Sequence, residues 1–224
     1  MKEITDPTAD GKVPTHVVTY RRLRDMILFG QLAPGQSVTI QGLTSLLNAG
    51  MTPVREAIRR LTAEGALEFL GNRRVVVPQL TQSQLDELAH ARLSIEPKLA
   101  KIAAQYIDDD DIIILKERDL EIDQAIATGD IHRYLLNNYQ FHFTLYERAG
   151  APILLSLARM LWLRSGPSLR VVCGRFGTAN LPDRHSDTLA ALRARDGDQA
   201  AAAIAADIEQ GIEQVRQSLV VDSI

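Results

Sequence analysis

Apolar residues follow helical spacing near the start of the chain. Between residues 16 and 29 they stand at Val17, Tyr20, Leu23 and Ile27, which predicts an amphipathic helix that Gly30 ends. A short helix is expected over 43–48. A third is expected over 52–65, the segment TPVREAIRRLTAEG, where a proline in the first turn costs no hydrogen bond.

Two short runs of β-forming residues, 66–70 and 74–78, come next and flank the polar Gly71-Asn72-Arg73. Runs of this length on either side of a polar turn predict a small β-hairpin. The first eighty residues are therefore expected to form three helices followed by a hairpin.

From residue 80 onward the pattern predicts helices alone. Thr81 and Gln84 have the spacing of a capping box at the start of a long helix. Asp130 is placed to cap the helix that contains NNYQFHFTLY, residues 137–146. Further helix boundaries are predicted at Gly129, Pro152, Pro182 and Gly197. We expect an all-α bundle of about six or seven helices.

The predicted fold is mostly α and has three parts. Residues 1–14 contain two prolines and no periodicity, which indicates a flexible arm. Residues 15–79 form the domain of helices and hairpin. Residues 80–224 form the helical bundle.

Composition places the chain among globular proteins. Of its 224 residues, 46% are apolar and 24% are charged. No apolar run approaches the roughly 18 residues of a membrane span, and the first residues lack the apolar core of a secretory signal. The single Cys173 excludes an internal disulfide. We therefore expect a cytoplasmic protein without a membrane partner.

The net charge of −3 is unevenly distributed. Residues 1–79 carry 10 Lys or Arg against 7 Asp or Glu, whereas residues 80–224 carry 15 against 21. A basic first third on an acidic remainder indicates that the N-terminal domain meets a polyanion. Solvated surface charge explains such modest numbers equally well.

The third predicted helix has the features of a DNA-recognition helix. In helix-turn-helix proteins the N-terminal residues of the second helix of the motif reach base edges, and Thr52, Arg55 and Arg59 stand at such positions here. Arginine suits bidentate contact with guanine or phosphate. At the hairpin tip, Arg73 and Arg74 would follow the DNA backbone or enter the minor groove. The alternative is that these arginines only solvate the surface.

The amino-acid sequence of this region resembles that of the GntR family of bacterial transcription regulators. The stretch PGQSVTIQGLTSLLNAGMTPVREAIRRLTAEGAL follows the winged helix-turn-helix of that family, and TPVREAIRRLTAEG is a near-complete match. The helical remainder resembles the FCD-type effector domain of the FadR subfamily through SIEPKLAKIAA, NNYQFHFTLYERAGAP and DRHSDTLAALRARDGD. The resemblance covers about 15–220. It implies a winged helix-turn-helix DNA-binding domain followed by an all-α domain for effector binding and dimerisation.

The DNA-reading half departs from the family pattern at a few positions. Gly50-Met51 stands where the family usually has Ser-Arg, and Arg73-Arg74 stands where its wing commonly has Arg-Gly. Gln41 falls near a frequent Arg or Glu. The absence of Arg at Met51 removes a base or phosphate contact, so we expect a changed operator sequence and affinity. Arg55 is the residue on which we expect operator binding to depend most.

The five histidines are at positions 16, 90, 132, 142 and 185, and none has zinc-protease or zinc-finger spacing. Taken alone, His142 in its apolar run is more often a core histidine than a metal ligand. Many FadR-subfamily effector domains bind a divalent metal through an Asp and a His one turn apart and two further His. The resemblance places these ligands on Asn138, His142, His185 and Asp207.

In this set, Asn138 and Asp207 replace the Asp and one His of the family. Two imidazoles, a carboxylate and a weaker amide ligand suit zinc, nickel or manganese, with water or an effector carboxylate completing the coordination. The alternative is a polar hydrogen-bonded cluster without metal. The resemblance also places Arg92 near this site, where it would bind a small carboxylate effector. Equally, Arg92 would pair with Glu96 one turn on.

The resemblance implies a homodimeric regulator that sets two recognition helices on a palindromic double-stranded DNA operator. Ligand binding would change the spacing or mobility of the winged domains. We expect a repressor released by its ligand, with activation as the other mode. Two alternatives stay open: a constitutive DNA-binding dimer with a lost effector site, and a metal-dependent enzyme. The enzyme is less favoured because the chain has no evident nucleophile or acid–base set.

Overall fold

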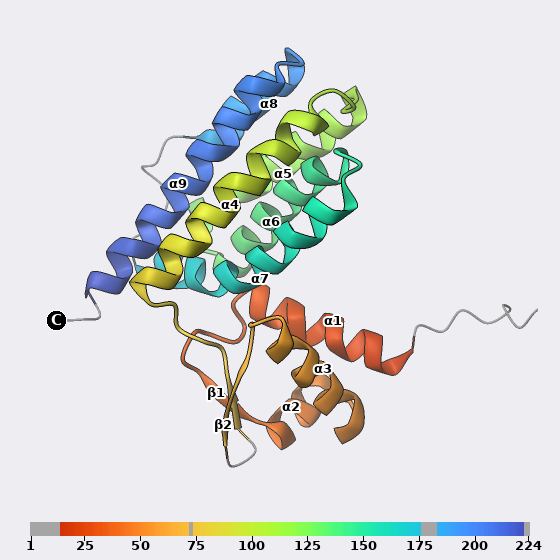
Figure 1. The fold of residues 1–224 in the computed structure, drawn as a ribbon, viewed down its shortest axis with the longest axis vertical. Helices are drawn as coiled ribbons and strands as arrows, with labels where there is room; N and C mark the ends of the chain where they lie inside the picture. The colour runs from red at the N-terminus through yellow and green to blue at the C-terminus, as the bar shows by residue number, and fades with distance from the viewer. Residues whose placement is uncertain (1–13, 72–73, 176–182, 222–224) are drawn as a thin grey trace, which may run out of the picture.

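The structure is a computed structural model of the 224-residue chain and describes residues 14–71, 74–175 and 183–221. The arm predicted over 1–14 lies outside these ranges apart from Pro14. Figure 1 shows a small lobe built from the first part of the chain and, above it, a bundle of long helices. The described residues form nine helices and three short strands, so the chain is mostly α as predicted.

The small lobe has the three predicted helices and the hairpin. Its elements are α1 (Thr15–Leu28), β1 (Ser37–Thr39), α2 (Ile40–Leu47), α3 (Met51–Ala63), β2 (Glu68–Gly71) and β3 (Arg74–Val76). The strands form an antiparallel sheet in the order β1-β3-β2. This arrangement is a winged helix-turn-helix, with the β2–β3 hairpin as the wing.

Two details of the lobe differ from the sequence analysis. β1 was not predicted, because a three-residue strand is too short to show alternation and its partner in β3 lies far along the chain. α2 begins at Ile40, three residues before the predicted start. The Thr39 hydroxyl caps it by accepting a hydrogen bond from the backbone N–H of Gly42 at 2.9 Å.

One apolar core holds the lobe together and exposes the outer face of α3. Leu23 and Ile27 of α1, Leu43 of α2, and Ile58 and Leu61 of α3 are all fully buried. These residues recur at helical spacing, so each helix buries one face against the others. The opposite face of α3 is left to solvent.

The bundle comprises six helices within the described residues. They are α4 (Gln82–Ala103), α5 (Asp109–Thr128), α6 (Ile131–Glu147), α7 (Pro152–Arg175), α8 (Arg184–Arg193) and α9 (Gly197–Val221). α4 and α9 run side by side in Figure 1. The predicted boundary at residues 79 and 80 falls between β3 and α4 and stays a prediction.

Local signals account for several ends of these helices. Thr81 and Gln84 form the predicted capping box of α4, and α4 continues through Pro97. The side chain of Asp130 accepts from the backbone N–H of Arg133 and caps α6. Gly129 ends α5 with a φ of 69°, in the left-handed region that favours glycine.

The lobe and the bundle meet at the end of α1. The ring of Phe29 packs edge-on against His132 and Tyr139 of α6, with centroid distances of 6.0 and 5.8 Å. Gly166 of α7 lies so close that an added Cβ would sit 3.1 Å from the carbonyl oxygen of Leu28. The end of α1 is therefore packed directly against two helices of the bundle.

Candidate DNA interface and metal site

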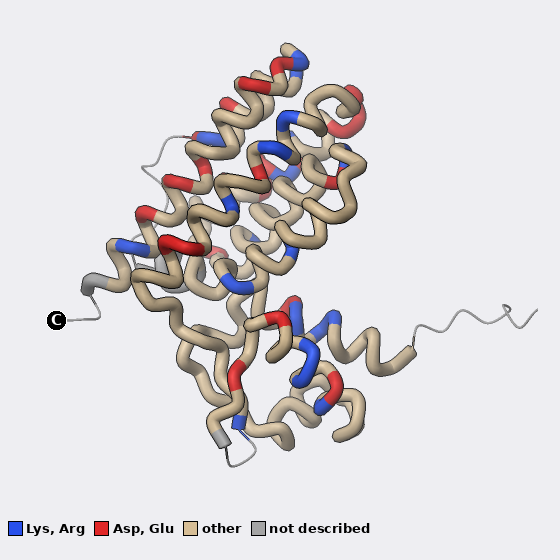
Figure 2. The backbone as a smooth tube through the Cα atoms, in the orientation of Figure 1, with Lys and Arg blue, Asp and Glu red and all other residues tan. Residues whose placement is uncertain are grey.

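The exposed face of α3 carries three of the residues predicted to contact DNA. Thr52, Arg55 and Arg59 are all exposed on this face. Figure 2 shows basic residues on α1 and α3 of the lobe, all of them Arg, with acidic residues beside them. With Phe69 of the wing, these three residues line an open groove of about 470 Å³. The groove lies where a recognition helix and its wing would meet DNA.

Neighbouring side chains hold two α3 arginines differently. The guanidinium of Arg60 lies 3.8 Å from the ring centroid of Tyr20, and its Nε donates to Glu64 at 3.0 Å. Arg60 is thus turned back on the lobe. The Nη2 of Arg55 lies 3.6 Å from the thioether of Met51, one turn earlier. Met51, at the position where the resemblance leads one to expect Arg, therefore contacts the Arg55 guanidinium.

Of the two wing residues predicted to contact DNA, the structure describes one. Arg74 begins β3, is exposed and pairs in register with Thr39 of β1. Arg73 lies outside the described residues.

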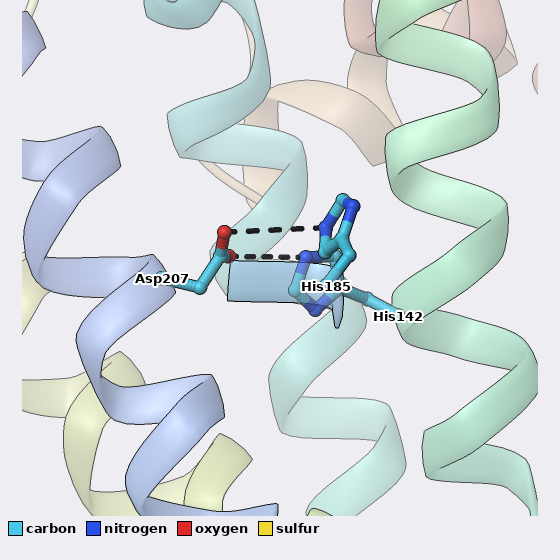
Figure 3. Close-up of side chains that lie close together, drawn as sticks. All are labelled: His142, His185 and Asp207. Atoms are coloured by element: carbon cyan, nitrogen blue, oxygen red, sulfur yellow. Dashed lines mark ion pairs between the residues drawn. The ribbon is translucent and has the colours of Figure 1, made fainter. Parts of the chain in front are cut away.

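A second cluster lies inside the bundle, where three helices bring together residues far apart in sequence. His142 comes from α6, His185 from α8 and Asp207 from α9. One ligand atom from each lies within 4.8 Å of the others. Figure 3 shows the three side chains pointing toward one another.

The facing atoms of this cluster are not hydrogen-bonded. The Nε2 of His142 lies 3.2 Å from Asp207 Oδ2, and the Nε2 of His185 lies 3.9 Å from Asp207 Oδ1. Both Nε2 atoms are buried without a hydrogen-bond partner in the described part of the chain. Buried polar atoms are costly when unsatisfied, so two orphaned ring nitrogens beside a carboxylate fit the donor set of a bound cation.

Asn138 completes the predicted set from one turn before His142. It is buried, and with His185 and Asp207 it lines a cavity of about 180 Å³. Three of the four residues predicted as metal ligands therefore line one cavity, and the fourth, His142, contacts Asp207 beside it. Two imidazoles, a carboxylate and an amide oxygen suit zinc, nickel or manganese with positions left open.

The other ring nitrogens of the two histidines have partners that the sequence analysis missed. The Nδ1 of His142 lies 3.0 Å from the hydroxyl of Tyr146, and the Nδ1 of His185 lies 3.2 Å from Asp119 Oδ1. Tyr146 stands four residues after His142, a spacing visible in the sequence. Asp119 is on α5, 66 residues before His185, and no local pattern connects them.

Burial and charge shift the pKa values of the three facing groups. Burial would raise the pKa of Asp207, but His142, His185 and Arg92 favour its carboxylate and lower the pKa to about 2. Burial lowers the pKa of His142. Burial also opposes protonation of His185, but Asp119 and Asp207 outweigh it and raise its pKa. The cluster thus contains a carboxylate and a neutral His142 near neutral pH.

Arg92 makes the predicted pair with Glu96, and its predicted contact with an effector stays a prediction. It lines the cavity, and it pairs with Glu96, its Nε and Nη2 donating to the two carboxylate oxygens at 2.6 and 3.1 Å. The guanidinium also lies 4.6 Å from the centroid of Trp162. Two of its N–H groups are therefore already used within the protein.

A winged helix-turn-helix with arginines on its recognition helix, joined to a helical bundle with an internal polar cavity, defines a DNA-binding transcriptional regulator. Family models agree with this class: that of the bacterial regulatory proteins of the gntR family matches residues 16–77, and that of the FCD domain matches residues 87–210. The chain belongs to the GntR family and carries an FCD domain.

Named relatives are regulators too. The chain is 30% identical over 193 residues to the HTH-type transcriptional regulator McbR of Escherichia coli strain K12, a match that covers 85% of this chain and 87% of the relative. It is 25% identical over 208 residues to the HTH-type transcriptional repressor RspR of the same organism, over 91% of this chain and 90% of the relative. The chain is accordingly a regulator and not an enzyme.

Solved structures share the whole fold. The structure of Escherichia coli McbR/YncC matches with a TM-score of 0.85 and 28% identity, over 92% of this chain and 99% of that one. A GntR regulator from Rhodococcus sp. RHA1 shares the fold with a TM-score of 0.73 at 22% identity, over 90% and 97% of the two chains. Across the described residues, no helix combines the length and apolarity needed to cross a membrane.

Proposed function

We propose that this chain is a cytoplasmic, homodimeric repressor whose operator binding is released by a small carboxylate effector bound with a divalent metal in the bundle. The observation that carries the proposal is the pair of buried, unpartnered Nε2 atoms of His142 and His185 facing Asp207. When both rings are neutral with the proton on Nδ1 and no cation is bound, two nitrogen lone pairs and a carboxylate face one another in a buried space. Zinc, nickel or manganese would satisfy all three.

The metal site proposed here uses Asn138, His142, His185 and Asp207. When bound, the metal supplies positive charge and open coordination positions. The proposed ligands supply a single negative charge, from Asp207, so a divalent ion together with these four ligands would keep a net positive charge. An anionic effector would complete the coordination.

The charges around the cavity support an effector that depends on the metal. Asp119, Asp123 and Asp183 line the same cavity as Asp207. Of the two arginines in the lining, Arg92 is paired with Glu96 and Arg184 with Asp187. A free carboxylate entering this space without metal would meet a negative potential. We therefore propose that the metal, more than Arg92, holds the effector carboxylate.

A chain of ring contacts connects the cavity to the DNA lobe. His142 lies 4.9 Å from Trp162, and Trp162 lies 5.7 Å from Tyr139, measured between ring centroids. Tyr139 in turn contacts Phe29 at the end of α1. A movement of α6 or α7 on ligand binding would therefore shift α1 and the attached recognition helix α3.

Exposed apolar side chains on the bundle support a dimer. Ile113 and Leu120 of α5 are 55% and 51% exposed, and Ile153 of α7 is 77% exposed. Exposed apolar residues of this size often mark protein contacts. A two-fold dimer would present two α3 helices to the half-sites of a palindromic operator, with Thr52, Arg55, Arg59, Arg73 and Arg74 as the proposed DNA-contacting residues.

Two measurements on one preparation test the proposal. The protein is purified without chelator or nickel column, its metal content is measured, and its binding to promoter DNA is titrated by gel shift with and without a panel of small organic acids. Stoichiometric metal and release of DNA by an acid, both lost in His185→Ala, support it. No metal and no response to any acid would favour a constitutive DNA-binding dimer.

A further inference from the structure

We infer that Tyr146 and Asp119 are positioning residues that hold His142 and His185 in the Nδ1–H tautomer, so that both Nε2 lone pairs are aimed at the metal position before any metal binds. This inference rests on the metal site proposed above. It assigns roles to two residues outside the ligand set.

The hydrogen-bond chain behind His142 fixes the direction of each proton. The hydroxyl of Tyr146 lies 2.9 Å from Glu96 Oε2 and 3.0 Å from the Nδ1 of His142. A phenol has one proton, and donation to a carboxylate is about twice as strong as donation to a neutral acceptor. The proton of Tyr146 therefore goes to Glu96, and the phenol oxygen accepts from the Nδ1–H of His142.

A single hydrogen-bond partner likewise sets the proton of His185 on Nδ1. Its Nδ1 lies 3.2 Å from Asp119 Oδ1, and an ionised carboxylate can only accept. The ring is also stacked on Phe141, with centroids 4.1 Å apart and planes 26° apart. Its Nδ1 therefore carries a proton, and its ring plane is set by packing.

Glu96 anchors this arrangement from the centre of the bundle. Its side chain is fully buried and accepts from Arg92 of α4, Tyr146 of α6 and Trp162 of α7. These contacts involve no metal, so the orientation of His142 is built into the fold. Partners of this kind fix the tautomer and orientation of metal-ligating histidines.

The arrangement also disfavours a competing state. If His142 carried its proton on Nε2, that proton could be shared with Asp207, and the cluster would close on itself. In the structure, Nε2 and Asp207 Oδ2 are 3.2 Å apart but not aligned for a hydrogen bond, whereas Nδ1 has a partner. Tyr146 thus keeps the cluster open toward a cation.

The test combines ring-nitrogen NMR of metal-free protein with zinc titration by calorimetry. In wild-type protein, histidine-specific ¹⁵N spectra are expected to show neutral His142 with a protonated Nδ1 and an unprotonated Nε2. Tyr146→Phe should move His142 toward the Nε2–H form and weaken zinc binding about 10- to 100-fold. Tyr139→Phe, on the same helix, is the matched control and should leave both readouts unchanged.

Asp119 supplies an independent arm if Tyr146→Phe fails to fold. Asp119→Ala should weaken zinc binding by a similar factor, and Asp119→Asn, whose amide oxygen still accepts from Nδ1–H, should restore much of it. A wild-type spectrum with the proton on Nε2 of His142, or wild-type zinc affinity in Tyr146→Phe and Asp119→Ala, would overturn the inference. If wild-type protein bound no zinc but showed the Nδ1–H form, the metal proposal would fail and the tautomer assignment would stand.

Discussion

The Nε2 of His142 on α6 and the Oδ2 of Asp207 on α9 lie 3.2 Å apart, yet no hydrogen bond joins them. Asp207 also lines the cavity that His185 and Asn138 line, and a ligand atom of His142 lies within 4.8 Å of those of His185 and Asp207. Because the distance is short and the alignment poor, the pair is better arranged to share a cation than a proton.

Metal should stabilise the fold measurably. Zinc at a free concentration 100 times its dissociation constant should add about 2.7 kcal/mol to the free energy of unfolding. For a chain of this size that corresponds to a rise in Tm of roughly 2–4 °C per kcal/mol, measured by calorimetric melting. His185→Ala should abolish the rise, and His90→Ala, which changes an exposed histidine on α4, should keep it. Equal shifts in both variants would argue against the site.

The amide at Asn138 should limit metal affinity. Asn138→Asp adds a carboxylate to the cavity, and we expect zinc to bind at least about tenfold more tightly, or 1.4 kcal/mol. Isothermal titration would measure it. Asn137→Asp is the matched control, because Asn137 bonds to Arg118 and the backbone of Arg133 and is not a proposed ligand. A gain in affinity that is the same in both variants would mean that Asn138 is not a ligand.

Arg55 should carry more of the DNA affinity than Arg60. Arg55→Ala is expected to weaken operator binding by more than about 1 kcal/mol. Arg60→Ala should cost less DNA affinity, because Arg60 is turned toward Tyr20 and Glu64. Gel-shift titrations at a fixed salt concentration compare the two, with circular dichroism to establish that both are folded. Unchanged binding in Arg55→Ala would remove this residue from the interface.

Phe29 should transmit the response of the bundle to the DNA lobe. Phe29→Ala removes the ring that contacts His132 and Tyr139. We expect Phe29→Ala without effector to bind DNA nearly as before, while the release of DNA by an effector acid in the presence of zinc is reduced or lost. Tyr106→Ala, an exposed aromatic change just after α4, is the control. A full response to the acid in Phe29→Ala would place the coupling elsewhere.

Zinc affinity should fall in mild acid. Asp119 and Asp207 overcome burial and raise the pKa of His185, so near and below that pKa zinc must displace a proton from the ring. Affinity is therefore expected to be constant well above the raised pKa and to decrease as the pH falls through it. His142, whose pKa burial lowers, adds no proton near neutrality. Calorimetry in buffers of different ionisation enthalpy counts the protons, and equal release at about pH 6.5 and about pH 8.5 would contradict this.

Local chemistry made much of the fold predictable from the sequence. The Thr81 and Gln84 capping box, the Asp130 cap and Gly129 each act within one turn of helix, so their effect can be read from adjacent residues. β1 was missed because its stability comes from pairing with β3 and not from its own three residues. Non-local pairing leaves little trace in a short segment.

The candidate site likewise contains features that the sequence predicted and features that depend on contacts between distant segments. The resemblance placed Asn138, His142, His185 and Asp207 together. In the structure Asn138, His185 and Asp207 line one cavity, and His142 clusters with His185 and Asp207. Sequence alone could not show that Asp119 holds His185, since α5 and α8 meet only in the folded bundle. The pairing of Arg92 with Glu96 was predictable from its four-residue spacing, whereas its burial was not.

The buried pair of Arg92 and Glu96 has a consequence for how this cavity can change over evolutionary time. Removal of either partner would strand the other's charge in the core, at a cost of about 3–5 kcal/mol, comparable to the whole stability margin of many proteins. Selection would therefore remove single substitutions at Arg92 or Glu96, and related proteins would retain both residues together. Asn138 does not belong to this pair, so new ligand preferences can arise there through single substitutions.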